Sequence, residues 1–90
     1  MILSILVTVT MYCLSGTTAS GTHTQHGIVA VSPDLHHRLP FGTKVRIDGK
    51  TYVVRDRTSS TRRNTIDIYT PKRSTAVQFG KQQKRVEIVK

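Results

Sequence analysis

Residues 44–55, KVRIDGKTYVVR, hold two runs of alternating apolar and polar side chains on either side of Asp48-Gly49. A period of two places the apolar side chains on one face of a strand. Asp-Gly between two such runs is typical of a two-residue turn, since both positions of that turn need positive φ. The segment therefore predicts a β-hairpin with strands at Lys44–Ile47 and Thr51–Arg55.

Strand signals recur on both sides of this hairpin. The run Ile28–Val31 is apolar throughout, which predicts a buried central strand, and the others are rich in β-branched residues. Two short helices are expected, one starting at Ser32-Pro33 with Ser32 as N-cap, and one over Ser74–Phe79 closed by Gly80. The remaining expected strands are residues 1–13, Thr65–Tyr69 and Arg85–Val89.

About six strands and two short helices in 90 residues predict an all-β fold. A small closed barrel is the economical arrangement, because closure leaves no exposed strand edge. The length allows one domain, over residues 1–90. The polar stretches 15–27 and 57–64 are expected to be loops, and long loops in compact domains are often functional.

Composition excludes several classes of protein. A multi-domain enzyme, a coiled coil and a membrane span are excluded by the length and by the absence of any apolar run of about 18–20 residues. The single Cys13 excludes an internal disulfide framework and a cysteine-based zinc site. The first residues lack a basic n-region, so we expect a strand there and recognise no signal peptide.

Two of the five carboxylates stand in unusual positions. Asp67 interrupts the apolar strand signal Ile66-Asp67-Ile68, and Asp56 ends the strand of the predicted hairpin. A carboxylate at the end of a barrel strand can face a cleft beside a second carboxylate, and both desolvation and a like charge raise its pKa toward that of a general acid. The alternative is ordinary ion pairing, for which the candidate partners are Arg55, Arg57, Arg62 and Arg63. The residues alone leave both open.

Six short segments follow one another along the chain: Thr17–Gly21 (TTASG), Gly27–Ser32 (GIVAVS), Leu39–Val45 (LPFGTKV), Val54–Arg57 (VRDR), Asn64–Tyr69 (NTIDIY) and Ala76–Gly80 (AVQFG). In this order they resemble the 3D domain, a family named for three aspartates. The similarity extends over roughly residues 7–89. It implies a six-stranded double-psi β-barrel, the fold of the barrel of membrane-bound lytic transglycosylase A, stationary-phase muralytic factors, rare lipoprotein A and expansins.

The resemblance also implies a chemistry. It makes Asp67 the acid/base of a peptidoglycan lytic transglycosylase and Asp56 its supporting partner, with Thr18 and Tyr69 as sugar contacts. No cofactor is implied. The family's first aspartate falls at Ser32 here, so its substrate-binding role passes to Asp34 two residues on.

The loop after Asp56 departs from the family pattern as well. It reads Asp56-Arg57-Thr58-Ser59 where relatives have Asp-Thr-Gly-Gly. A barrel that binds wall glycan without cutting it, or a structural barrel such as a phage virion component, is therefore the alternative to the enzyme.

The net charge of +9, from 14 Lys and Arg against 5 Asp and Glu, predicts an anionic partner or a solvated basic surface. Peptidoglycan glycan strands are the favoured partner, which places the domain outside the cytoplasm, at a cell wall or in a virion. Nucleic acid is less favoured, because no platform of clustered aromatics is visible. His23, His26, His36 and His37 lack a completing ligand set, so no metal is expected. The oligomeric state stays open.

Overall fold

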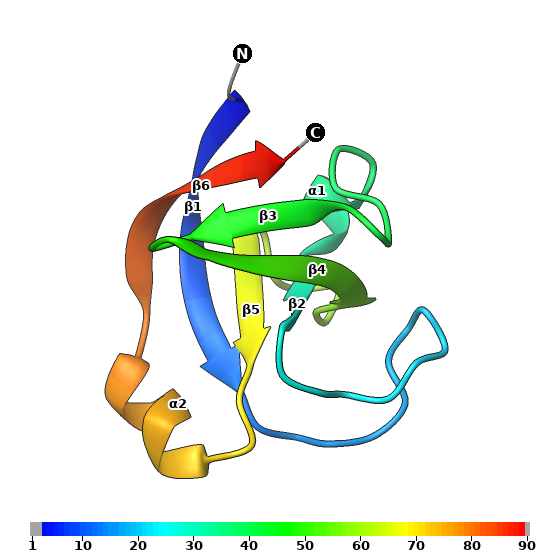
Figure 1. Ribbon diagram of the computed structural model, residues 1–90, viewed down its shortest axis with the longest axis vertical. Helices are drawn as coiled ribbons and strands as arrows, with labels where there is room; N and C mark the ends of the chain where they lie inside the picture. Colours follow the sequence, from blue (N-terminus) through cyan, green and yellow to red (C-terminus); the bar gives the residue numbers. More distant parts are fainter. Residues whose placement is uncertain (1–2, 90) are drawn as a thin grey trace.

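The computed structural model describes residues 3–89, and residues 1, 2 and 90 lie outside the described part. Six strands close into a barrel with two short helices on its outside (Figure 1), as the sequence predicts. The strand expected over residues 1–13 occupies Leu3–Tyr12, and its first two residues are not among those described. In chain order the elements are β1 (Leu3–Tyr12), β2 (Ile28–Val31), α1 (Pro33–His36), β3 (Lys44–Ile47), β4 (Lys50–Arg57), β5 (Thr65–Tyr69), α2 (Arg73–Phe79) and β6 (Gln82–Val89).

The strands follow one another around the barrel in the order β1-β5-β2-β4-β3-β6. Two neighbouring pairs, β1 with β5 and β2 with β4, are parallel, and the other four pairs are antiparallel. This is the double-psi β-barrel that the sequence led us to expect. Its consequence for function is that strands distant in the sequence, β1, β5, β2 and β4, form one continuous wall.

The hairpin between β3 and β4 forms as predicted. Asp48 and Gly49 take φ angles of 51° and 81°, the positive values that a two-residue turn of this kind requires. The register pairs Val45 with Tyr52 and Ile47 with Lys50. Val45 and Ile47 are buried while Lys44 and Arg46 are exposed, so the alternation read from the sequence is the alternation of the strand.

The core fills the inside of the barrel with β-branched side chains. All four residues of β2 are buried, which confirms the central strand predicted from its unbroken apolar run. Burying each Val or Ile side chain contributes about 1.5–3 kcal/mol relative to leaving it exposed. The residues with no exposed surface in this cluster are Val7, Val9, Val29, Val31, Leu39, Val45, Val54, Ile66 and Val86.

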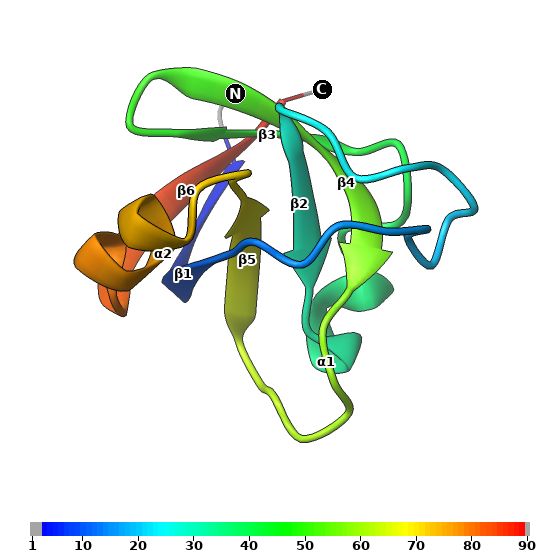
Figure 2. The same ribbon diagram turned by 90° about the horizontal axis from the view of Figure 1, so that it is seen from below.

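The two helices pack on the outside of the barrel (Figure 1). Ser32 occupies the N-cap position of α1, but its side chain makes no capping hydrogen bond; its Oγ accepts the Thr65 N–H at 3.0 Å and ties α1 to β5. Helix α2 ends at Gly80, where φ is 67°, and it lies beside the end of β1 (Figure 2). Across residues 3–89 neither helix has the length and apolar character that crossing a bilayer demands.

Candidate functional site

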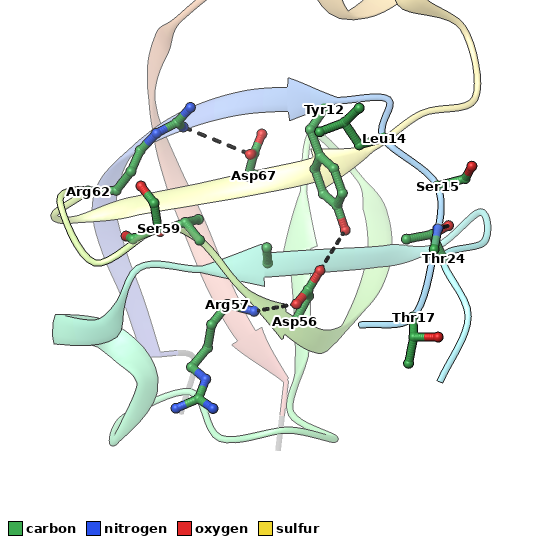
Figure 3. Close-up of a pocket in the computed structure, with 13 residues that line it drawn as sticks. Tyr12, Leu14, Ser15, Thr17, Thr24, Asp56, Arg57, Ser59, Arg62 and Asp67 are labelled. Carbon is green, nitrogen blue, oxygen red and sulfur yellow. Dashed lines mark hydrogen bonds and ion pairs between the residues drawn. The ribbon is translucent and has the colours of Figure 1, made fainter. Parts of the chain in front are cut away.

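An open groove of about 410 Å³ lies across the ends of β1 and β4 and the middle of β2 and β5. The loop that follows β1 forms one wall, and the loop between β4 and β5 forms the other. Figure 3 shows Asp56 and Asp67 facing this groove, with the Tyr12 hydroxyl directed toward Asp56. Its lining consists of Tyr12, Leu14, Ser15, Gly16, Thr17, Thr24, Ala30, Asp56, Arg57, Thr58, Ser59, Arg62 and Asp67.

Strand pairing places the two aspartates on either side of Ala30. In the register of the barrel, Ala30 of β2 is the partner of Asp67 on β5 and of Asp56 on β4. A register shift between Val29 and Ala30 brings Asp56 to this position, and such irregularities re-aim side chains near functional sites. The methyl group of Ala30 is the smallest side chain that keeps Cβ, so it leaves the floor of the groove open between the two carboxyl groups.

The carboxyl group of Asp67 is mostly buried at the edge of the groove. Its side chain is 11% exposed, and its Oδ1 accepts a hydrogen bond of 2.8 Å from the Thr10 hydroxyl. Burial raises the pKa of Asp67 above its ordinary value, and the negative charge of Asp56 adds to this. The Thr10 hydroxyl and the Arg62 guanidinium act in the opposite direction, and burial is the larger effect.

Arg62 is the ion-pair partner that the alternative interpretation anticipated. Its Nη1 lies 3.8 Å from Asp67 Oδ2 and 3.3 Å from Thr10 Oγ1. The guanidinium side chain is 45% exposed, and a long contact to a solvated cation is a weak pair. Arg62 therefore borders the groove beside Asp67 without closing it.

Asp56 is held in a fixed orientation by its neighbours. Its Oδ1 accepts the N–H groups of Ala19 and Arg57, each at 2.9 Å, and the Tyr12 hydroxyl donates to its Oδ2 at 3.5 Å. The bond from Ala19 also fastens the long loop after β1 to the end of β4. Asp56 is thus a positioned charge beside Asp67, and none of the ion pairs among residues 3–89 includes it.

Tyr12 donates a hydrogen bond to Asp56 and lies close enough to Asp67 to feel its charge. Burial raises the pKa of its hydroxyl, and the charges of Asp56 and then Asp67 raise it further, so the phenol stays protonated. Its ring packs edge-on against Tyr69 with the ring centroids 5.5 Å apart. Tyr12 is also part of the groove lining.

Three residues predicted as substrate contacts lie elsewhere. Thr18 is 5% exposed, and its hydroxyl shares hydrogen bonds with Ser20 and Thr22 of its own loop. Its neighbour Thr17 lines the groove instead. Tyr69 supports Tyr12 from outside the groove lining.

Asp34 also lies outside the groove lining, at the first turn of α1, where its carboxylate accepts the Asn64 N–H. A hydrogen bond from Ser32, and then the bond from Asn64, lowers the pKa of Asp34 below its ordinary value. This carboxylate therefore anchors the loop that leads into β5.

The other two acidic residues have structural partners. Asp48 pairs with Lys84 at 2.9 Å and Glu87 with Arg46 at 3.6 Å, both at the surface. In the described part of the chain, no group of three or more His, Cys, Asp or Glu side chains is arranged to hold a metal ion.

Three residues of the groove or in contact with Asp67 escaped the sequence interpretation. Thr10 falls at a polar position of the alternating first strand, Tyr12 lies at the end of that strand, and Ala30 lies in a run that signals burial only. Only the pairing of strands could have pointed to them. The parallel pairing of β1 with β5 places Thr10 beside Asp67 and Tyr12 beside Tyr69.

The first comparison with known proteins concerns the fold of the domain. No family model matches the chain. The Streptomyces papain inhibitor (SPI) has the same fold, with a TM-score of 0.68 over 98% of this chain and 96% of that chain. The two sequences are 20% identical, so this likeness establishes the barrel fold alone.

A sequence relative is more specific. YabE of Bacillus subtilis (strain 168), which is named as a cell wall shaping protein, is 30% identical over 80 residues. The similarity covers 83% of this chain and 19% of YabE, so the chain spans about a fifth of the length of that relative.

Proposed function

We propose that this domain is a 3D-type barrel that cleaves peptidoglycan as a lytic transglycosylase, with Asp67 as its acid/base. The observation that carries the proposal is a nearly buried carboxyl group with a raised pKa at the edge of an open groove. A general acid must hold its proton near the working pH, and burial beside Asp56 favours the protonated form.

The reaction needs one carboxyl group in two successive roles. Protonated Asp67 donates its proton to the oxygen of the β-1,4 bond between N-acetylmuramic acid and N-acetylglucosamine, and the bond from the anomeric carbon to that oxygen breaks. The resulting carboxylate takes the proton of the muramic acid 6-hydroxyl while that oxygen attacks the anomeric carbon. The products are a free 4-hydroxyl and a 1,6-anhydro ring, and no water enters the reaction.

The neighbours of Asp67 suit this cycle. Thr10 donates to Oδ1, which leaves Oδ2 to carry the proton toward the groove. Asp56 favours the protonated state before cleavage, and Arg62 favours the carboxylate formed after proton donation. The two neighbouring charges thus act on the pKa of Asp67 in opposite directions.

The groove walls offer contacts for sugar. Hydroxyl groups of Ser15, Thr17 and Ser59 surround the opening, and the Tyr12 ring supplies an apolar face. A cavity of about 410 Å³ lies within the usual range of roughly 300–1,000 Å³ for ligand sites. In this proposal Thr17 takes the sugar-contact role that the family resemblance implied for Thr18.

Localisation at the cell wall agrees with the net positive charge of the chain and with the name of its sequence relative YabE. YabE carries a cell-wall name, and a net charge of +9 attracts the carboxylates and phosphates of bacterial walls. We therefore place the domain outside the cytoplasm, associated with a cell wall or with a phage particle that attacks one.

Purified sacculi test the cleavage. Wild-type protein is expected to release muropeptides with anhydro ends, detected by mass spectrometry, and Asp67→Asn is expected to release none while it still pellets with the sacculi. Ser74→Ala, which removes an exposed hydroxyl on α2 outside the groove lining, is the control and should cleave normally. Full activity in Asp67→Asn would move the acid to another residue.

A glycan-binding barrel without cleavage is the second candidate. The contact between Arg62 and Asp67 favours it, because an ion-paired carboxylate is a poorer proton donor. In that case wild-type protein and Asp67→Asn would pellet equally with sacculi, and neither would release soluble fragments.

A further inference from the structure

A second hollow, strongly basic, opens directly beside Asp67. Its volume is about 460 Å³, and it lies over β1, the start of β5 and the loop before β5. It shares Arg62 with the groove described above, and it also contains Thr10, the hydrogen-bond partner of Asp67. The lining consists of Thr8, Thr10, Thr61, Arg62, Arg63, Thr65 and Lys81.

The charges of this hollow are not balanced by its own lining. Three cations and four hydroxyl-bearing residues line it, and no carboxylate does. Arg62 has the long contact to Asp67, and Arg63 is near enough to Asp34 to lower the pKa of that carboxyl. Lys81 takes part in none of the ion pairs found within residues 3–89. Excess positive charge in a concave site attracts anions.

The fold brings these groups together from separate parts of the chain. Thr8 and Thr10 lie on one face of β1, and the register pairs Thr8 with Thr65 of β5. Lys81 follows Gly80, which ends α2, and so enters the hollow from the opposite side. Segments that are distant in the sequence thus contribute hydrogen-bond donors to the same hollow.

One hydroxyl has a hydrogen to spare. The Thr8 Oγ1 accepts from Gln83 Nε2 at 2.9 Å, so its own hydrogen is free to donate to a ligand. The Thr10 hydroxyl donates to Asp67, and the Thr65 hydroxyl donates to the Arg63 carbonyl. Thr8, with the cations, therefore forms the donor set for an anion.

Arg62 connects this donor set to the acid. Its guanidinium is 45% exposed and lies 3.8 Å from Asp67, so it is free to form a closer, bidentate pair with a carboxylate or phosphate in the hollow. An anion held there competes with Asp67 for Arg62. By thermodynamic linkage, removal of the Asp67 charge must strengthen binding of the anion.

We propose that the hollow formed by Arg62, Arg63, Lys81 and Thr8 binds a carboxylate or phosphate carried by the wall polymer, and that this anion shares Arg62 with Asp67. The proposal rests on the function proposed above for the role of the polymer, whereas the anion site itself does not need cleavage. An occupied hollow would hold the glycan strand in register with the groove and would withdraw Arg62 from the acid.

Titration of the protein with inorganic phosphate, followed by backbone amide NMR, tests the site without any cleavage. Shifts are expected at residues 61–65, Thr8 and Lys81. Lys81→Gln combined with Arg63→Gln should weaken binding about tenfold or more, which is 1.4 kcal/mol or more. Lys72→Gln, an exposed cation outside this hollow, is the matched control and should leave affinity nearly unchanged. Asp67→Asn should tighten binding about 2- to 5-fold, the range expected for loss of a weak ion pair.

Three results would overturn the proposal. One is equal weakening by Lys72→Gln, which would mean a diffuse basic surface. Another is unchanged phosphate affinity in Lys81→Gln with Arg63→Gln. A site that binds duplex DNA more tightly than wall polymer would also contradict it, because the ligand would then be nucleic acid.

Sacculi with and without teichoic acid separate the two sources of the anion. Weaker pelleting after removal of teichoic acid identifies phosphate, and unchanged pelleting that is lost in Lys81→Gln identifies stem-peptide carboxylate. Phosphate binding with the expected variant pattern, in a protein that cleaves nothing, would support the site while refuting the proposed reaction.

Discussion

Replacing Asp67 with Asn is expected to stabilise the barrel at neutral pH. Burial raises the pKa of Asp67 in the folded chain above its ordinary value of 3.8. The folded state therefore binds this proton more tightly than the unfolded state does, and stability is lost as the pH rises through the raised pKa. An uncharged amide of the same shape removes that loss.

The size of the effect follows from the contacts of Asp67. Substitutions that relieve an unfavourable group at a functional site commonly gain about 0.5–2 kcal/mol. The amide oxygen of Asn can still accept the 2.8 Å bond from Thr10, and loss of the exposed Arg62 pair costs about 0–1 kcal/mol. We expect a net gain of about 1 kcal/mol at pH 7, or about 4–8 °C in Tm for a domain of this size.

Urea and thermal unfolding of both proteins across a pH series measure this gain. The difference should be largest near neutrality and should vanish below pH 3.8, where the carboxyl is protonated in both states. Asp34→Asn is the control of opposite sign, because the pKa of Asp34 is lowered and its carboxylate stabilises the fold at neutral pH. A variant Asp67→Asn that is less stable than wild type at pH 7, or a gain independent of pH, would refute the reasoning.

Three further changes probe the groove. Arg62→Gln removes a charge that lowers the pKa of Asp67, so the high-pH limit of sacculus cleavage should move to higher pH; a shift to lower pH would contradict the assignment. Asp56→Asn removes a charge that raises the same pKa, so a pH–rate profile should show the limit moving to lower pH. Ala30→Val fills the floor between the two aspartates, and we expect lost binding to sacculi in pelleting assays with a stability cost of about 1–3 kcal/mol from overpacking. Normal cleavage by the Ala30 variant would show that substrate does not enter between the carboxyl groups.

The strands could be predicted from the sequence because their signals are local. Alternation and Asp48-Gly49 define the β3–β4 hairpin, and the unbroken run Ile28–Val31 marks the central strand. Asp67 stood out for the same reason, as a charge within an apolar strand. Each of these features depends on neighbours along the chain.

The geometry of the site depends on pairing between distant strands, which no local pattern carries. Nothing in the residues of β2 indicates that Ala30 has Asp67 on one side and Asp56 on the other, since that follows from a closed barrel and a register shift. The Thr18 hydroxyl is engaged by Ser20 and Thr22 within its own loop, which the sequence pattern also does not indicate.

Digestion of purified sacculi in water enriched in heavy oxygen tests the central claim most directly. If Asp67 serves as both acid and base, wild-type protein will release anhydro-ended muropeptides that contain no heavy oxygen, and Asp67→Asn will release none. Heavy oxygen at the new reducing ends would mean hydrolysis, and identical products from the two proteins would remove Asp67 from the reaction.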